Sequence, residues 1–234
     1  MIIISDAHVS RQHGNHEAFF QMLALLEGNA EDLVFLGDIF DLWIALPRYE
    51  DSIHRRFLTW CRAQGRRRSI GFVEGNHEYF VARGKRQYFS WCTDGACMRD
   101  AAGTLFCHGD QINRKDLQYL RFRKLSKNRL TRMLLRGLLP GPRLVEILKV
   151  KMKTTNPAFR KTLPRTEIDS FAEAEFRNGV RCVFVGHFHQ QYRYCNADGC
   201  CLYTVPGWCT SGLVTRYEST TGEVRHVNWR SLDR

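Results

Sequence analysis

Long apolar runs are missing from this chain of 234 residues. No stretch reaches the roughly 18 consecutive apolar residues that a membrane-spanning helix requires. A signal peptide is missing too, because Met1–Ile4 leads directly into Ser5 without a basic region or a cleavage site. Since the chain also lacks a low-complexity linker and an internal repeat, we expect one cytoplasmic domain spanning residues 1–234 around one sizeable core.

No two of the nine cysteines form a Cys-x-x-Cys pair, and their number is odd. Several lie inside apolar runs, as in Leu105–Cys107 and Cys182–Phe184. We therefore expect reduced, buried thiols, as is usual in the cytosol. Cys195, Cys200 and Cys201 are the alternative, a structural zinc site, but they have no fourth ligand at suitable spacing.

Acidic residues are nearly missing from one segment. Residues 114–165 contain 16 lysines and arginines but only two acidic side chains, Asp116 and Glu146, which gives a charge of +14. The rest of the chain contains 19 basic and 22 acidic side chains, so this segment accounts for the whole net charge of +11. Apolar residues recur among its cations at helical spacing, with a break at Pro140–Pro142. We predict that this segment is an inserted cap of basic amphipathic helices.

Outside the insert, short apolar runs alternate with helical patterns. The apolar runs predict strands at residues 1–4, 32–36, 69–73, 104–107 and 180–185. Apolar residues at helical spacing predict helices over residues 15–27 and 50–64. After Gln191, alternating residues are broken by turn sequences, which predicts β-hairpins. Together these patterns predict an α/β fold with a mixed sheet.

Polar clusters follow five of the expected strands. They are Asp6-Ala-His8, Gly37–Asp41, Gly75–Glu78, His108–Asp110 and Gly186–His189. Any one of them alone would be explained by a turn, a helix cap or a hydrogen-bonded core histidine. Because ligands of α/β sheets gather at the carboxyl ends of the strands, we expect the five clusters to converge.

Asp, His and Asn offer the oxygen and imidazole ligands that suit manganese, iron or zinc. We predict two divalent metal ions, Mn²⁺ first and iron or zinc as alternatives, with Asp38 as the bridging carboxylate. One ion would be bound by Asp6, His8, Asp38 and His189. The other would be bound by Asp38, Asn76, His108 and His187. Two metals about 3.5–4 Å apart can clamp the attacking and leaving oxygens of a displacement at phosphorus, so hydrolysis of a phosphate ester or anhydride is the expected chemistry.

His77 follows the expected ligand Asn76 and is therefore expected to point into the same site. Asp41 lies three residues after Asp38. A carboxylate that binds one imidazole nitrogen fixes the tautomer and raises its basicity. We predict that Asp41 orients His77, which would protonate the leaving oxygen or bind the phosphoryl group.

With its five blocks in this order, the chain resembles the calcineurin-like metallophosphoesterase superfamily. That resemblance implies a β-sandwich of mixed sheets flanked by helices (αββα), with both metals at one edge. Within the superfamily it resembles most the UDP-2,3-diacylglucosamine pyrophosphatases of lipid A synthesis. Asp116–Arg123 is similar to their Asp-x-x-Tyr-x-x-Phe-Arg signature, a basic helical insert follows, and Gly207-Trp208 and Gly212–Val214 are similar to their closing strands.

This resemblance implies that water attacks the α-phosphorus of UDP-2,3-diacylglucosamine, releasing UMP and 2,3-diacylglucosamine 1-phosphate. The substrate contacts that it implies are Asn76, His77, Asp116, Tyr119, Arg123 and His187. The chain departs from typical members, which have Gly-Asn-Arg-Asp in place of Gly75–Glu78 and often Glu in place of Asp41. The family's Ser, Asn and Lys contacts also do not map cleanly onto residues 151–163.

The basic insert favours two partners, the nucleotide-linked lipid and an anionic membrane surface. A cationic amphipathic helix can lie on such a surface, with about 1 kcal/mol gained per Lys or Arg, so we expect peripheral association with the inner face of the cell membrane. The alternative to membrane binding is a cap that packs on the core and whose charges are only solvated. A nuclease or cyclic-nucleotide phosphodiesterase is the other functional candidate, but the apolar residues among the cations disfavour nucleic acid. A non-catalytic scaffold should have lost ligands, and none is lost. No sequence feature specifies an oligomeric state.

Overall fold

Two β-sheets pack face to face in the computed structural model, which describes residues 1–95, 97–137 and 163–232. The first sheet has the strand order β13 (Glu223–Asn228), β12 (Leu213–Glu218), β1 (Ile2–Ile4), β2 (Leu33–Phe35), β4 (Ile70–Val73) and β6 (Trp91–Thr93). The second has the order β10 (Tyr192–Cys195), β11 (Cys201–Thr204), β9 (Cys182–Val185), β8 (Thr104–Cys107) and β7 (Met98–Arg99). A small parallel pair joins β3 (Trp43–Ile44) to β5 (Glu78–Tyr79).

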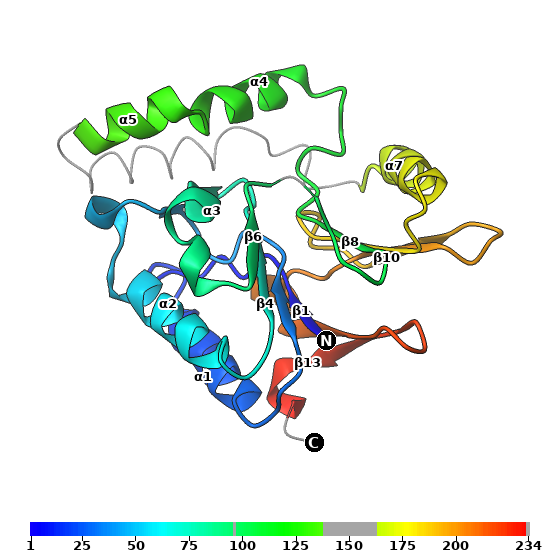
Figure 1. Ribbon diagram of the computed structural model, residues 1–234, viewed down its shortest axis with the longest axis horizontal. Coiled ribbons are helices and arrows are strands. Elements are labelled where there is room, and N and C mark those ends of the chain that lie inside the picture. Colours follow the sequence, from blue (N-terminus) through cyan, green and yellow to red (C-terminus); the bar gives the residue numbers. More distant parts are fainter. Residues whose placement is uncertain (96, 138–162, 233–234) are drawn as a thin grey trace.

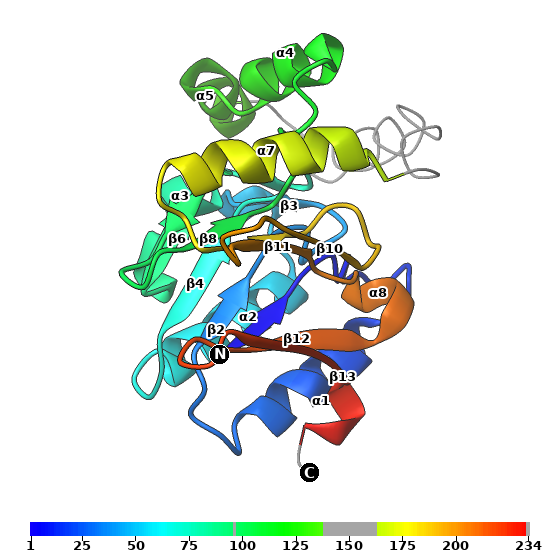
Figure 2. The same cartoon turned by 90° about the vertical axis from the view of Figure 1, so that its right-hand side faces the viewer.

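Helices cover the outer faces of both sheets, so the layers run helix, sheet, sheet, helix (Figure 2). The helices α1 (His16–Leu26) and α2 (Ser52–Gln64) lie on the first sheet, and α7 (Arg165–Arg177) lies on the second. The predicted α/β sandwich of mixed sheets is confirmed. Helix α7 itself was not expected, although Ile168, Ala172 and Phe176 recur at four-residue spacing and pack in the core beneath it.

The strand residues alternate between two cores. Ile2 and Ile4 of β1 face α1 and α2, whereas Ile3 between them faces the second sheet. In β9, Val183 faces α7 and Phe184 faces the first sheet. A strand points successive side chains to opposite faces, and here both faces are covered, so these strands are apolar throughout.

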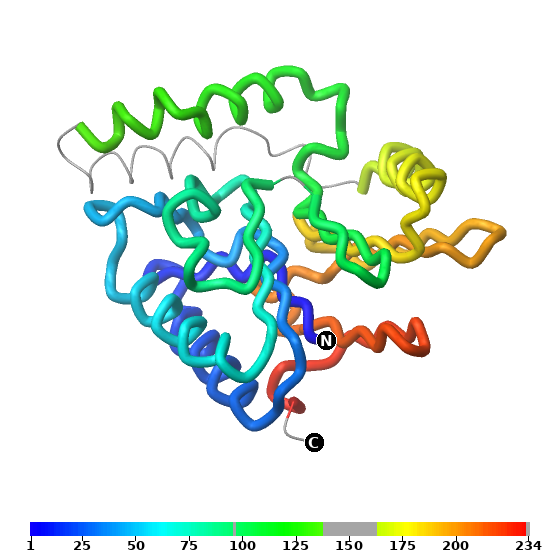
Figure 3. The backbone as a smooth tube through the Cα atoms, in the orientation of Figure 1, coloured from blue at the N-terminus to red at the C-terminus, as the bar shows by residue number. Residues whose placement is uncertain are grey.

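The insert begins after β8 with two helices, α4 (Leu117–Ser126) and α5 (Arg129–Gly137), which run along the top of the molecule on the same side as α3 (Val81–Gly84) (Figures 1 and 3). Both helices carry several basic side chains, and the cap as a whole stays a prediction. The rest of the predicted cap, from residue 138 to residue 162, lies outside the described residues. Within the described part of the chain, no helix is long and apolar enough to cross a membrane.

Four cysteines correct the expectation of reduced thiols. Cys97 is bonded to Cys107 and Cys195 to Cys201, with Cα–Cα separations of 4.4 and 4.1 Å. The second pair lies directly opposite across the antiparallel strands β10 and β11, where side chains are close enough to bond. This pairing also removes two thiols from the alternative zinc site. Cys61 and Cys182, by contrast, are buried free thiols, as expected.

Candidate metal centre

The carboxyl ends of five strands meet at one edge of the sandwich. β1, β2 and β4 are parallel neighbours in the first sheet, and β8 and β9 in the second. The loops after these strands carry the nine candidate side chains Asp6, His8, Asp38, Asp41, Asn76, His77, His108, His187 and His189. The two sheets are joined at this edge by a hydrogen bond of 2.8 Å from the backbone N–H of His187 to Asp6 Oδ2. The predicted convergence of the clusters is therefore present.

Two groups of possible ligands share one carboxylate. In the first, ligand atoms of His8, Asp38 and His77 all lie within 4.8 Å of one another. In the second, the same holds for Asp38, His108 and His187. Asp38 thus belongs to both groups, and its role as a bridging ligand stays a prediction. The first group contains His77, whereas the predicted ion site has Asp6 and His189 beside His8 and Asp38.

The Asp38 carboxylate is buried among three imidazoles. It is 2% exposed, and its Oδ2 lies 3.5, 3.8 and 3.9 Å from the Nε2 atoms of His108, His77 and His8. Burial alone would raise the pKa of Asp38, but the imidazoles of His77 and His108 hold that pKa well below its usual range. Burial likewise opposes protonation of His108, yet the Asp38 carboxylate outweighs it and raises the pKa of His108 to about 10. The Asp38 carboxylate therefore favours positive charge on His108, the imidazole closest to it.

Asp6 and His189 lie together on another side of the candidate metal centre. Asp6 is fully buried, and its Oδ1 has no hydrogen-bond partner, although His189 Nε2 lies 3.4 Å away. The Nε2 atoms of His8 and His189 face each other at 3.4 Å. A carboxylate oxygen without a donor and imidazole nitrogens turned toward one another are a donor set that fits a divalent cation. Cys209 Sγ lies on the same side, 3.8 Å from His189 Nδ1, and sequence reasoning missed it.

Asn76 lies between two histidines. Its Oδ1 is 3.1 Å from His108 Nε2 and 3.0 Å from His187 Nδ1. The other ring nitrogen of His108 donates to the Leu36 carbonyl at 2.9 Å, which leaves Nε2 directed at the centre. Burial, together with His108, lowers the pKa of His187 to about 4, so its imidazole is neutral at pH 7 and able to bind a cation.

The backbone is in the left-handed region at five of these positions. The φ angles are 51° at Asp6, 41° at His8, 52° at Asp38, 68° at His187 and 56° at His189. Such angles cost a residue with a side chain roughly 1–3 kcal/mol, and they are concentrated at functional sites. Five of the six non-glycine residues with positive φ in the described part of the chain therefore belong to the candidate site, and Phe80 is the sixth.

Two motif glycines let the loops approach closely. A Cβ at Gly37, whose φ is +89°, would lie 2.4 Å from His108 Nδ1. A Cβ at Gly75 would lie 2.2 Å from Asp38 Oδ1. A side chain at either position would displace a candidate ligand, which explains why glycine precedes Asp38 and Asn76.

Asp41 and His77 form a pair through a different atom than predicted. His77 Nδ1 donates to the backbone carbonyl of Asp41 at 2.5 Å, and the Asp41 carboxylate is not its partner. The pairing of β3 with β5, which contain Trp43 and Glu78, brings the two loops together. Because a carbonyl only accepts, this bond still fixes the tautomer and leaves His77 Nε2 facing Asp38. The orienting role predicted for the carboxylate therefore belongs to the main chain.

Glu78 was quoted in the sequence only as part of a motif, yet it holds two metal loops together. Its buried carboxylate accepts from the backbone N–H groups of Asp38 at 2.8 Å, Ile39 at 2.6 Å, Phe40 at 3.4 Å and Gly75 at 2.7 Å. Burial and the Asp38 charge raise the pKa of Glu78 to about 8, while these donors favour its ionised form. Nothing in the sequence pattern shows that a carboxylate here accepts from the loop 40 residues earlier.

The other predicted substrate contacts lie on the insert and bind the protein itself. Asp116 caps α4, accepting from Tyr119 N at 2.9 Å. The Tyr119 hydroxyl and Arg123 Nε, the latter at 2.6 Å, both donate to the buried Asp110 Oδ2. These bonds fasten α4 to the loop after His108. A direct substrate contact by the three insert residues stays a prediction.

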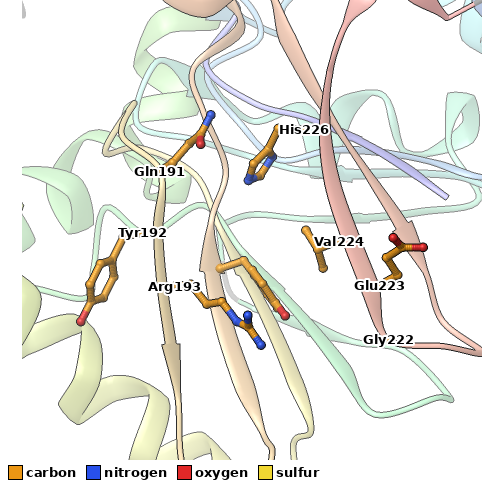
Figure 4. A pocket seen from close by; sticks show the side chains of 8 residues that line it. Gln191, Tyr192, Arg193, Gly222, Glu223, Val224 and His226 are labelled. Carbon is orange, nitrogen blue, oxygen red and sulfur yellow. The ribbon is translucent and has the colours of Figure 1, made fainter.

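A cavity of about 450 Å³ lies away from the candidate ligands, between the edge strands β10 and β13 (Figure 4). Gln191 and His226 face each other across it, whereas the Tyr192 ring points away toward α7. The Tyr192 hydroxyl donates to Asp169 of that helix at 2.8 Å. None of the candidate ligands lines this cavity.

The chain is similar to known proteins along most of its length. Residues 1–191 match the family model described as calcineurin-like phosphoesterase. A UDP-2,3-diacylglucosamine hydrolase of Stutzerimonas stutzeri is 28% identical over 211 residues, covering 81% of this chain and 82% of that protein. One from Pseudomonas syringae pv. syringae is 26% identical over 200 residues, covering 81% and 79%. A third, from Azotobacter vinelandii, is 30% identical over 150 residues, covering 58% of each chain.

Replacing Glu78 by glutamine tests whether it holds the two loops. The amide would turn one accepting oxygen into a donor that faces backbone N–H groups. We expect a loss of about 1–3 kcal/mol in the free energy of unfolding, measured by urea denaturation, together with lower bound Mn²⁺. Glu17→Gln, at an exposed position on α1, is the control. Equal stability of the two variants would contradict the clamp.

Replacing His77 by alanine separates a catalytic role from metal binding. We expect kcat toward a phosphodiester with an alkyl leaving group to fall by about 10²–10⁴-fold while the Mn²⁺ content is kept, because the predicted role is protonation of the leaving oxygen. Asp41→Asn should leave the His77 tautomer unchanged, since the backbone carbonyl remains. Loss of bound Mn²⁺ in His77→Ala would instead identify His77 as a ligand.

Proposed function

Because this chain belongs to the calcineurin-like phosphoesterase family and is a metal-dependent hydrolase, we propose that it cleaves the pyrophosphate of UDP-2,3-diacylglucosamine to UMP and 2,3-diacylglucosamine 1-phosphate. The hydrolases of this name to which it is similar support that substrate. The observation that carries the proposal is the position of a cationic helix pair with exposed apolar side chains beside the metal centre. A water-soluble phosphodiester would not require such a surface.

The proposed centre binds two divalent ions, for which Mn²⁺ is our first choice. Asp6, His8, Asp38 and His189 would hold one ion, and Asp38, Asn76, His108 and His187 the other. Such ions supply Lewis acidity and lower the pKa of water, so that hydroxide is available near neutral pH. Asp38 would bridge the pair, which matches its position in both groups of ligands.

In the proposed reaction, water attacks the α-phosphorus and the bond to the bridging oxygen breaks. That oxygen leaves with the diacylglucosamine 1-phosphate, while the α-phosphorus becomes part of UMP. As an imidazolium, His77 would keep its Nδ1–H bonded to the Asp41 carbonyl and would donate its Nε2 proton to the leaving oxygen. Asn76 and His187 would contact the phosphoryl oxygens.

We further propose that α4 and α5 dock on the cytoplasmic face of an anionic membrane. Their large exposed apolar side chains are Leu117, Phe122, Leu125, Leu130, Met133 and Leu134. Leu125 and Met133 are 66% and 68% exposed, which is unusual for side chains of this size in water. Exposed cations, among them Arg121, Arg129 and Arg136, lie on the same two helices. Apolar side chains would enter the lipid boundary while the cations contact the headgroups.

Product analysis tests the proposed reaction. The purified protein with Mn²⁺ should release UMP from UDP-2,3-diacylglucosamine but leave single-stranded DNA uncut. His8→Ala and Asp38→Ala should abolish release and lower the metal content. Cleavage of DNA with no release from the lipid would contradict the proposed substrate and favour a nuclease. UMP release by both variants would contradict the ligand assignment.

Liposome flotation tests the membrane proposal. Vesicles containing anionic lipid should bind the protein in a salt-sensitive manner, because exposed charges are screened over about 10 Å at 0.1 M salt. Neutralising Arg121, Arg129 and Arg136 together should weaken binding. Neutralising three exposed arginines elsewhere, Arg66, Arg177 and Arg230, is the charge-matched control. Equal binding of both triple variants, or equal binding to neutral vesicles, would contradict docking through α4 and α5.

A further inference from the structure

One side of α4 carries three polar side chains at four-residue spacing. Tyr119 and Arg123 reach Asp110, and Lys127, the residue that ends the helix, reaches a different loop. Residues four apart lie on the same face of a helix, so the three point inward together. Tyr119 and Arg123 are part of the signature shared with the resembling family, whereas Lys127 lies outside it.

Lys127 is buried by specific contacts. Its side chain is 9% exposed, and Nζ donates to the Gly75 carbonyl at 2.5 Å. Nζ also lies 3.7 Å from Glu74 Oε2 and 5.4 Å from the centre of the Tyr79 ring. Removing an ammonium group from water is costly unless it is paired and hydrogen-bonded, so this placement depends on the loop being where it is.

The loop in question carries Asn76. The Gly75 carbonyl belongs to the peptide group that joins Gly75 to Asn76. On the other side of the same residue, Gly75 N donates to Glu78 Oε2 at 2.7 Å. The Gly75 N–H is therefore bonded to the Glu78 carboxylate of the sandwich, and the Gly75 carbonyl to the Lys127 ammonium of the insert. With both peptide groups fixed, Asn76 Oδ1 keeps its position between His108 and His187.

Glu74 connects Lys127 to α3. Its Oε1 accepts from Ala82 N at 2.7 Å in the first turn of α3, and its side chain is almost fully buried. Glu74 and Lys127 are thus mutual partners in a buried position between α3, α4 and the Asn76 loop. A cavity of about 350 Å³ beside them is lined by, among others, Phe80, Arg83 and Gln111.

We propose that Lys127 is a positioning residue of the metal centre, which couples the docking of the insert to the placement of Asn76. The proposal rests on the proposed function only in taking Asn76 as a metal ligand, and it does not depend on the substrate. Coupling between two sites is reciprocal: a docked insert should strengthen metal binding, and bound metal should hold the insert in place.

Mn²⁺ titration of Lys127→Met tests the first direction. We expect one of two Mn²⁺ sites to weaken by about 10- to 100-fold, the usual effect of removing a group that orients a ligand, with the other site unchanged. Lys124→Met removes an exposed cation from the same helix and should bind Mn²⁺ like the wild type. Unchanged affinity in Lys127→Met, or an equal loss in Lys124→Met, would overturn the proposal.

Limited trypsin digestion tests the reciprocal direction. Mn²⁺ should slow cleavage at Arg129 and Arg136 in the wild type and in Lys124→Met, but not in Lys127→Met. Mn²⁺-independent cleavage in the wild type would overturn the coupling. If Lys127→Met folds poorly because Glu74 is left without its cation, the double variant Lys127→Met/Glu74→Gln should regain the melting temperature but not the metal affinity. Recovery of both would show a merely structural pair and overturn the proposal.

A generic phosphodiester separates this proposal from the proposed function. Toward bis(p-nitrophenyl) phosphate, Lys127→Met should need about 10- to 100-fold more Mn²⁺ than the wild type to reach half of its own maximal rate. A wild-type protein that binds two Mn²⁺ ions and cleaves this ester but not UDP-2,3-diacylglucosamine would contradict the substrate and leave the role of Lys127 intact. A wild-type protein that binds no Mn²⁺ would overturn both.

Discussion

The Asp38 carboxylate is the constraint on which the rest of the centre depends. It is buried at the edge of an apolar sandwich with a second carboxylate, Glu78, bonded to its own backbone N–H. Two buried anions this close are tolerable only if donors and cations surround them. Backbone N–H groups satisfy Glu78, and imidazoles surround Asp38. A divalent ion held by Asp38, as we propose, would add positive charge beside these two anions.

The sandwich sustains the strain that this geometry requires. Asp6, His8 and Asp38 are left-handed at the ends of strands whose bodies are fully buried. Their loops are bonded to each other, with Asp6 N donating to the Gly37 carbonyl and His8 N to the Asp38 carbonyl, both at 3.0 Å. The first sheet brings three parallel strand ends to this edge, and the second sheet adds two. The fold therefore supplies rigidity where single turns would relax to ordinary angles.

Local pattern determined how much of this could be predicted from the sequence. Strands and the polar residues directly after them are local features, so the α/β sandwich and the convergence at Asp38 could be predicted. Contacts between distant loops could not. The bond from His77 reaches a backbone carbonyl rather than the Asp41 side chain, and Glu78 accepts from a loop that no spacing connects to it. The Cys195–Cys201 pair was missed for a different reason, because composition favoured reduced thiols although the hairpin places the two directly opposite.

Helix α4 lies between the candidate metal centre and the surface that we propose to face the membrane. Its inward side, through Arg123 and Lys127, is bonded to loops of the centre, and its outward side exposes Leu125. If such a helix moves as one body, a force on one side reaches the other. Insertion of the outward side into lipid would therefore change how firmly Lys127 holds the Asn76 loop. A soluble phosphodiester, which brings no membrane with it, would not use the connection that we propose.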